Sequence, residues 1–500
     1  MKKFSSSLLV AMAAILFSSN VLSQKMNTGV LRPITTADAV ETRIGILKFE
    51  QGFPTEETKS KVFDEIDYQR AVQAYLWAYP VVSFQSIMME AKRFGNDLND
   101  LWIADNFVDP KSLWLTANDV TIYAVANIDL GKQGPVVVDI PPGAIVGMIE
   151  DFWQRSLVDV GLPGPDGDKG GKFLVLPPGY TGDAPASGYH VFKGTSNNYN
   201  VMVRGIIVNN DKNAAVQNLK QVKIYPLSEQ SNPKPNKFTS MSGMLDNTLP
   251  PAGLEFWKSC SAFINNNPVE ERDRFYMGML KPLGIEKGKP FQPDARQRKI
   301  LEDAAKIGDA MGRVMLFDGP ERFTGVHAFP GTNWHWVFLV NSKQETENYG
   351  QVDERLHYTY GAIYTSPALG VMKAGPGGNY VQAFRDKDGN RFDGGKSYRL
   401  HVPANVPAVA LWSLTLYSTE TRSMLPNPTN DAAHSSYDKL KINADGSIDL
   451  YFGPKAPAGN EGNWIETVPG KGFYPMFRFY TPKAGLFDGT WKLPDIEQVK

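Results

Sequence analysis

The stretch from Ser397 to Lys483 constrains the fold of this 500-residue chain more than any other part. It opens with YRLHVPANVPAVALWSLTLYS and closes with GFYPMFRFYTPK, so apolar residues recur at alternate positions between Pro, Asn and Gly. A period of two predicts antiparallel strands with one face in a core. The Asp-Gly steps at Asp388 and Asp445 predict tight hairpin turns in and beside this stretch.

A fainter version of the same pattern lies upstream. Strand-like runs occur at VVVDIPP (136–142), DFWQRSLVDV (151–160), FLVLPPGY (173–180) and NYNVMVRGIIV (198–208). Their spacing is typical of two packed sheets. The chain also contains 45 Gly and 35 Pro, which suits a protein rich in turns. We therefore expect a second β region before the one that ends near Lys483.

Helical patterns separate and precede these β regions. Between Asp67 and Met89 apolar residues fall on one helical face, and Pro80 is expected to divide this stretch into a pair of helices. Residues 228–250 are polar and aperiodic, which is typical of a linker. Asn267-Pro268 has the form of a helix start, and residues 300–315 have one apolar and one charged face.

The pattern as a whole predicts a mainly β chain with a helical module, too long for one ordinary core. The expected divisions are a signal peptide (1–23), a leader without a sustained period (24–59), a helix pair with the first β region (60–227), a linker with the helical domain (228–320) and the second β region (321–500).

The first 23 residues have the form of a secretory signal peptide. Lys2 and Lys3 precede the apolar run LLVAMAAILF (8–17), and small residues lead to Ser23. The run is shorter than the roughly 20 residues of a membrane-spanning helix, so we expect cleavage near Ser23 and no membrane association afterwards. The single Cys260 forbids an intrachain disulfide and is expected to be a buried thiol. An exported protein without disulfides suits the bacterial periplasm, or secretion.

Charge excludes one class of partner. The chain has 52 basic and 53 acidic residues and no long basic block. Such a balance offers no field that would attract a polyanion, so we expect no nucleic-acid partner.

Motifs in both β regions resemble two bacterial families. The first region, with YLWAYP (75–80), LTANDVTIYA (115–124) and the steps Asp129-Leu130 and Gly134-Pro135, resembles domain of unknown function 1254. The second resembles domain of unknown function 1214 through DGNRFDGGKSYRL, ALWSLTLYS, INADGSIDLYFGPKAPAGNEGNW, GFYPMFRFYTP and WKLP (491–494). The resemblance covers most of residues 65–497. It implies an immunoglobulin-like or related β-sandwich, a helical domain and a jelly-roll-like β-sandwich, in that order, and it supplies no catalytic residue.

A polar corner in the first region is the most suggestive binding site. Trp114, Asn118, Asp119 and Tyr123 flank an Asn-Asp step, where a bend would gather an amide, a carboxylate and a phenol around a small pocket. Alternatively, the Asn-Asp step only satisfies backbone groups at a turn. Further ligand-binding candidates, because Arg and Trp often anchor recognition surfaces, are Trp334, His335, Trp336, Arg355 and Arg478. Packing inside a sandwich is the alternative for these.

No strong motif for a metal, a cofactor or a nucleophile is present. None of the six histidines forms HExxH, and a hydrogen-bonded histidine in a sandwich interior is the favoured explanation of His335, with a metal-binding or catalytic histidine as the alternative. The stretch DKDGNRFDGG gathers oxygen atoms that calcium favours, although a tight turn explains the same residues: Asp386, Asp388, Asn390 and Asp393. We find no cofactor signature.

These patterns favour an exported protein that binds a small molecule or glycan, or assembles as a homo-oligomer, through its β regions. The alternative is an extracytoplasmic hydrolase or lyase with an acid/base site between the two β regions. A cleft that gathers His335, Arg355 or Asp119 with a second ionisable group would favour that alternative.

Overall fold

The computed structural model describes residues 37–209 and 211–499, and the predicted signal peptide lies outside them. Strands make up 28% and helices 27% of the structure, so the protein is mixed and more helical than the mainly β class that the sequence predicts. Contacts between residues divide the chain into two units, and the boundary in the sequence falls between Ile66 and Asp67. No helix among the described residues is both long enough and apolar enough to span a membrane.

The described part of the first unit contains a small antiparallel sheet. Its strands are β1 (Ala39–Thr42), β2 (Gly45–Glu50) and β3 (Phe53–Pro54), paired in that order. Most of their side chains are exposed. Strands without a buried face need no alternation of apolar residues, and for this reason the pattern of residues 24–59 does not predict them.

Helix α2 (Glu56–Arg93) runs without interruption through Pro80, where the sequence predicts a break and a pair of helices. Proline removes one backbone N–H and normally disfavours a helix interior. Here the neighbouring Tyr79 and Val81 are buried, and Gln154 Nε2 donates to the Pro80 carbonyl at 3.3 Å. Tertiary packing therefore outweighs the lost helical hydrogen bond.

The first β region consists of two sheets with one apolar core between them. The larger sheet has the order β14-β4-β6-β12-β8-β9 and the smaller has the order β11-β10-β7-β13. The strands are β4 (Leu101–Ile103), β6 (Ile122–Asp129), β7 (Val136–Ile140), β8 (Ile145–Asp151), β9 (Ser156–Gly161), β10 (Gly171–Leu176), β11 (His190–Lys193), β12 (Asn198–Gly205), β13 (Lys223–Pro226) and β14 (Phe238–Ser240). Two short helices, α3 (Leu130–Gln133) and α4 (Lys212–Leu219), and the pair β5 (Ser112–Leu113) and β15 (Asp246–Asn247) complete it.

The larger sheet is buried on both faces. Ala124 of β6 and Val203 of β12 belong to the core between the two sheets. Their neighbours Val125 and Met202 point the other way, into a core that includes the helices and the second β region. This outer face of the larger sheet positions the cavity described below.

Four helices lie between the two β regions in sequence, or next to the second: α5 (Gly253–Asn266), α6 (Arg274–Leu280), α7 (Ala295–Phe317) and α8 (Val352–Gly361). Asp294 starts α7 with a capping box, since its carboxylate accepts from Gln297 N at 2.8 Å and the Gln297 side chain accepts from Asp294 N at 2.8 Å. Glycines on α7 let aromatic rings of α2 and α8 approach its backbone closely.

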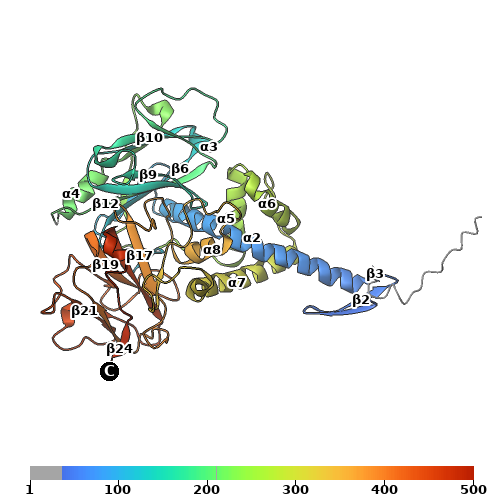
Figure 1. The fold of residues 1–500 in the computed structure, drawn as a ribbon. Helices are drawn as coiled ribbons and strands as arrows, with labels where there is room; N and C mark the ends of the chain where they lie inside the picture. The colour runs from blue at the N-terminus through green and yellow to red at the C-terminus, as the bar shows by residue number, and fades with distance from the viewer. Residues whose placement is uncertain (1–36, 210, 500) are drawn as a thin grey trace, which may run out of the picture. The chain divides into compact units, whose positions relative to one another are not determined.

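The second β region also consists of two sheets, with the orders β16-β17-β23-β19-β20 and β22-β21-β18-β24. Its strands are β16 (Trp334–Trp336), β17 (Gly378–Ala383), β18 (Ser397–Val402), β19 (Ala408–Ser418), β20 (Ala433–Ser435), β21 (Ile448–Gly453), β22 (Trp464–Glu466), β23 (Phe473–Pro482) and β24 (Glu497–Val499). Strand β17 (Figure 1) contacts β12 of the first region, since the side chains of Tyr380 and Arg204 meet there.

Candidate functional site

A narrow cavity lies where the outer face of the larger first sheet meets β17 and α8. Its volume is about 50 Å³, so the cavity is slender. Most of its wall is apolar or aromatic. The lining residues are Val108, Trp114, Leu115, Thr116, Ala117, Tyr123, Val125, Met202, Arg204, Met241, Val337, Tyr358, Ile363, Tyr364, Leu369 and Tyr380.

Two neighbouring strands supply the polar side of this wall. Tyr123 on β6 is paired directly with Arg204 on β12, and Val125 is paired with Met202. Alternate residues of a strand face opposite ways, so these four side chains share the outer face of the sheet. Trp114 enters the wall from the loop that precedes β6.

The opposite side is built around Tyr380 on β17, which is paired with Arg478 on β23. Arg204 Nη1 donates to Tyr380 Oη at 3.4 Å, and the Arg478 guanidinium carbon lies 5.1 Å from the centre of the Tyr380 ring. Arg478 also donates to the carbonyl of Thr116 at 3.0 Å and to the Tyr417 hydroxyl. One arginine thus lines the cavity, and the other stands behind its aromatic wall.

Both arginines are buried without a carboxylate in ion-pair contact among the described residues. Arg204 is 5% and Arg478 0% exposed, and the Nε of each lacks a hydrogen-bond partner. A guanidinium stays protonated in proteins, and a buried charge without a counter-ion is costly. The phenols nearby supply dipoles but no charge, because burial raises the pKa of Tyr123 and of Tyr480. The cavity therefore lies in a region of excess positive charge.

The nearest acids do not cancel this charge by pairing. Glu150 on β8 is 0% exposed, its Oε1 accepts from Thr365 N at 2.6 Å, and its Oε2 lacks a partner. Burial raises the pKa of Glu150 well above its ordinary value, which favours the neutral acid. Asp159 on β9 accepts from Ala368 N at 3.1 Å and forms no ion pair with Arg204.

The structure gathers most of the predicted polar corner at this cavity. Trp114 and Tyr123 line it, and the Asn118 amide donates to the Tyr123 hydroxyl. Asn118 Oδ1 also accepts from Val120 N at 3.1 Å, so this residue both stabilises the turn and orients the phenol. Asp119 instead faces a separate hollow with Asp431, His434 and Asp438. Burial, with a smaller effect of Asp431, raises the pKa of Asp119 to about 7.

The remaining predicted residues lie elsewhere. Trp334 and Trp336 are buried in the large core, and Trp334 Nε1 donates to the Pro494 carbonyl at 2.9 Å. His335 lies 2.9 Å from Glu321, and burial lowers the pKa of its imidazole. Arg355 on α8 is buried, and burial with the nearby Arg272 lowers its pKa to about 10. His335, Arg355 and Asp119 therefore do not share one cleft.

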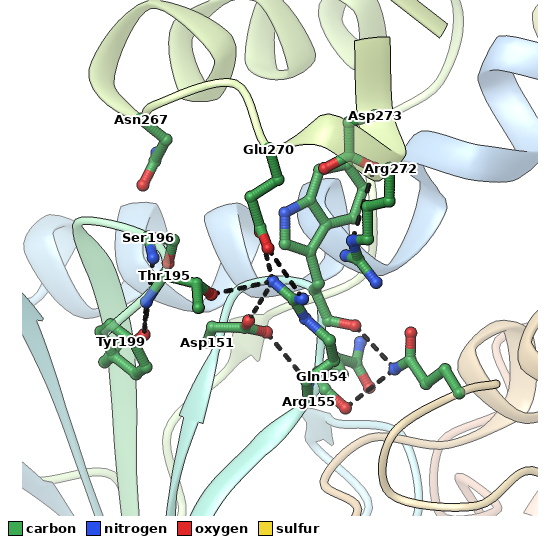
Figure 2. A network of polar contacts seen from close by, with 12 residues as sticks. Asp151, Gln154, Arg155, Thr195, Ser196, Tyr199, Asn267, Glu270, Arg272 and Asp273 are labelled. Atoms are coloured by element: carbon green, nitrogen blue, oxygen red, sulfur yellow. Dashed lines mark hydrogen bonds and ion pairs between the residues drawn. The ribbon is translucent and has the colours of Figure 1, made fainter. Parts of the chain in front are cut away.

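A second polar network ties the turn after β8 to the helical module (Figure 2). Arg155 reaches between two carboxylates: its Nη2 is 2.6 Å from Asp151 Oδ2, and its Nη1 donates to Glu270 Oε2 at 3.1 Å. Asp273 accepts from Trp77 Nε1 at 3.1 Å. Because Arg155 is already paired with carboxylates, this network stabilises the fold and offers no free charge to a ligand.

The calcium candidate and the cysteine have local explanations. Asp386 Oδ1 accepts from the backbone N–H of Asp388 at 3.0 Å and of Asn390 at 2.8 Å, and Asp393 Oδ1 accepts from Gly395 N at 2.9 Å. These bonds are those of tight turns. Cys260 is buried on α5, and burial raises the pKa of its thiol to about 12.

Arg204 and Tyr380 are the cavity residues that sequence reasoning missed. The available signal was the charge of Arg204 inside the otherwise apolar run VMVRGIIV, at a position where a buried strand rarely holds a cation. Tyr380 carries no comparable signal, because a tyrosine in a strand is ordinary.

Comparisons with known proteins identify two family regions. Residues 98–226 match a family described as a protein of unknown function (DUF1254), and residues 377–484 match another so described (DUF1214). Both occur in the order that the sequence predicts. A comparison with curated proteins finds no match.

One solved structure supports the fold. The crystal structure of the VPA0106 protein from Vibrio parahaemolyticus is similar with a TM-score of 0.54 and 21% identity, covering 87% of this chain and 100% of that one. A putative uncharacterized protein from Burkholderia cenocepacia has a TM-score of 0.39 and 11% identity, with 88% of this chain and 97% of that chain covered. At this identity the first likeness concerns the fold alone.

Proposed function

We propose that this chain, in which a DUF1254 region precedes a DUF1214 region, binds a small apolar molecule with a carboxylate group in the cavity between its two β regions. One observation carries the proposal. Arg204 lines an apolar cavity, is 5% exposed and has no carboxylate partner among the described residues. A bound anion would supply the missing counter-charge.

The chemistry of the walls specifies the ligand class. A guanidinium presents a planar fork of donors that matches a carboxylate, and Arg204 Nε is free of other bonds. Trp114, Tyr123 and Tyr380 offer aromatic surfaces for the rest of the ligand. The cavity of about 50 Å³ is smaller than the roughly 150 Å³ that holds a benzene ring, so a bulky molecule is excluded and a single ring with short substituents enters only when the lining side chains move apart.

Calorimetric titration of the full chain tests this proposal with three probes of one shape: benzoate, benzamide and benzyl alcohol. We expect benzoate to bind and the two uncharged analogues to bind at least about tenfold more weakly, since a charge-assisted hydrogen bond contributes about 1.5–3 kcal/mol. Equal affinity for the three, or no binding of any, contradicts the proposal.

The variant Arg204→Met separates a ligand-binding arginine from a structural one. It should abolish the preference for benzoate and should raise the melting temperature of the unliganded protein, because it removes a buried charge that lacks a counter-ion. The control Arg274→Met, whose side chain is 70% exposed, should change neither. Loss of stability in Arg204→Met with benzoate binding retained would mean that Arg204 only supports Tyr380.

A hydrolase or lyase is the second candidate, and Glu150 is the observation that favours it. Burial raises the pKa of this acid and so favours its protonated form, one of its oxygens has no partner among the described residues, and it lies on the same face of the sheet as Met202 and Arg204. It has the properties of a general acid. Turnover of phenyl acetate by the wild type but not by Glu150→Gln would support this candidate. If a wild-type protein that binds benzoate does not turn over phenyl acetate when benzoate is absent, the candidate is excluded for such esters.

The proposal extends to architecture and location. Two sheets around a shared core are consistent with an immunoglobulin-like first sandwich and a jelly-roll-like second one.

We infer export to the periplasm or medium, with cleavage near Ser23, and assembly as a homo-oligomer. Mass spectrometry of the mature N-terminus tests the first inference, and light scattering after size-exclusion chromatography tests the second. An intact residue 1, or a monomeric mass, would contradict them.

A further inference from the structure

Three side chains with metal-ligand chemistry meet outside the cavity. Glu321 lies in the short turn Gly319–Arg322, His327 follows it, and His335 is on β16. One ligand atom from each lies within 4.8 Å of the other two. His335 Nε2 is 2.9 Å from Glu321 Oε1, and His327 Nε2 is 3.4 Å from Glu321 Oε2.

The backbone holds the two histidines together. His327 and His335 face each other across an antiparallel bridge, and their ring centres are 5.0 Å apart. His327 Nδ1 lies 3.0 Å from the carbonyl oxygen of Thr332. A carbonyl only accepts, so Nδ1 carries a hydrogen, and Nε2 is the ring nitrogen that faces Glu321. Proteins orient metal-binding histidines by this kind of bond from the distal ring nitrogen.

His335 contacts a single polar partner among the described residues, the Glu321 carboxylate, and its Nδ1 has none. It is 7% exposed, and neither ring nitrogen makes a hydrogen bond. Its 2.9 Å contact with Glu321 is an ion-pair distance without the alignment of a hydrogen bond. By contrast, the buried His357 is satisfied on both nitrogens, by the Met315 carbonyl at 3.0 Å and by Gln382 Nε2 at 3.4 Å. A buried imidazole that makes no hydrogen bond is costly unless something binds it.

We propose that Glu321, His327 and His335 bind a divalent transition-metal ion, with zinc the best match. Tetrahedral zinc with bonds of about 2.0–2.2 Å places its ligand atoms roughly 3.3–3.6 Å apart. The separations of 2.9 Å from His335 to one Glu321 oxygen and 3.4 Å from His327 to the other are close to this spacing. Two imidazoles with one carboxylate suit zinc or cobalt, whereas calcium and magnesium prefer oxygen ligands.

The site has room for a fourth ligand. The side chain of Glu321 is 62% and that of His327 41% exposed, so water reaches the ion from their side. None of the three residues lines the cavity proposed to bind a carboxylate. The metal site is therefore independent of that proposal and is tested separately.

Cobalt titration of the metal-free full chain without a histidine tag tests the site. We expect one Co²⁺ per chain with the visible absorption of tetrahedral coordination, displaced by one equivalent of Zn²⁺. The variants Glu321→Gln and His327→Gln change exposed side chains, and each should weaken Co²⁺ binding at least about tenfold without loss of the fold by circular dichroism.

The matched control is His401→Gln. His401 Nδ1 lies 2.9 Å from Asp449 Oδ1 as a histidine–carboxylate pair, but these two residues form no three-ligand group. This variant should bind Co²⁺ like the wild type. Absence of stoichiometric binding, octahedral cobalt spectra, or equal affinity of Glu321→Gln, His327→Gln and the wild type would overturn the proposal.

Discussion

At the scale of single residues, burial decides the charge state of the side chains near the cavity. The buried arginines keep their charge, whereas burial raises the pKa of the carboxyl groups of Glu150 and Asp119. The cavity is therefore electropositive although the whole chain has a formal net charge of −1. A composition that excludes a polyanion as partner is thus compatible with a site for one small anion.

Asp119 makes the stability of the folded protein depend on pH. Its pKa of about 7 in the folded protein exceeds the ordinary value of 3.8, so between pH 4 and 7 the folded state holds a proton that the unfolded state has lost. The contribution of Asp119 to the free energy of unfolding is therefore fully present below pH 4 and is lost as the pH rises through 7. Asp119→Asn should therefore gain stability relative to the wild type over this range, by about 2 kcal/mol after allowance for its partial exposure.

Urea denaturation at pH 4.5, 6 and 7.5 measures this gain. The control Asp183→Asn changes an exposed carboxylate and should follow the wild type at each pH. Parallel curves for Asp119→Asn and the wild type would show that Asp119 ionises freely in the folded protein.

At the scale of elements, aromatic rings of α2 and α8 lie against two glycines of α7. A methyl group added at Gly308 would lie 2.3 Å from the Tyr75 ring, and one at Gly312 would lie 2.3 Å from the Tyr360 ring. Both rings are buried. Small residues at this spacing let two aromatic side chains reach the helix backbone.

The substitution Gly312→Ala should therefore destabilise the protein, by roughly 1–3 kcal/mol, because the Tyr360 ring must shift in a packed core. Gly278→Ala on α6 is the matched control, since nothing lies within 4 Å of the added methyl group. That control should be stabilising by about 0.5–1 kcal/mol through helix propensity. Urea midpoints measure both, and a gain in stability for Gly312→Ala would mean that α7 and α8 are packed loosely.

Element patterns also mark the limit of prediction from this sequence. The strands of both β regions and the amphipathic α7 follow from local periodicity, as does the corner at Asn118. The continuity of α2 through Pro80 does not, because it depends on burial by segments distant in sequence. The same is true of the junction of Arg204 with Tyr380, which lie 176 residues apart and meet only when β12 and β17 come together.

At the scale of the whole molecule, the cavity belongs to neither β region alone. One wall comes from β6 and β12, the other from α8, the segment after it and β17. The large core joins the outer face of the first region to the helices and the second region. A ligand held between them would strengthen this junction, so binding and stability of the folded chain are expected to be linked.

The most direct measurement is a crystal structure of the full chain with 4-bromobenzoate, located by the anomalous signal of its bromine. We expect bromine in the cavity between β12 and β17, with the carboxylate on the guanidinium of Arg204, and no bromine there in crystals of Arg204→Met. Bromobenzoate bound only at surface lysines, or held in the cavity equally well by Arg204→Met, would contradict it.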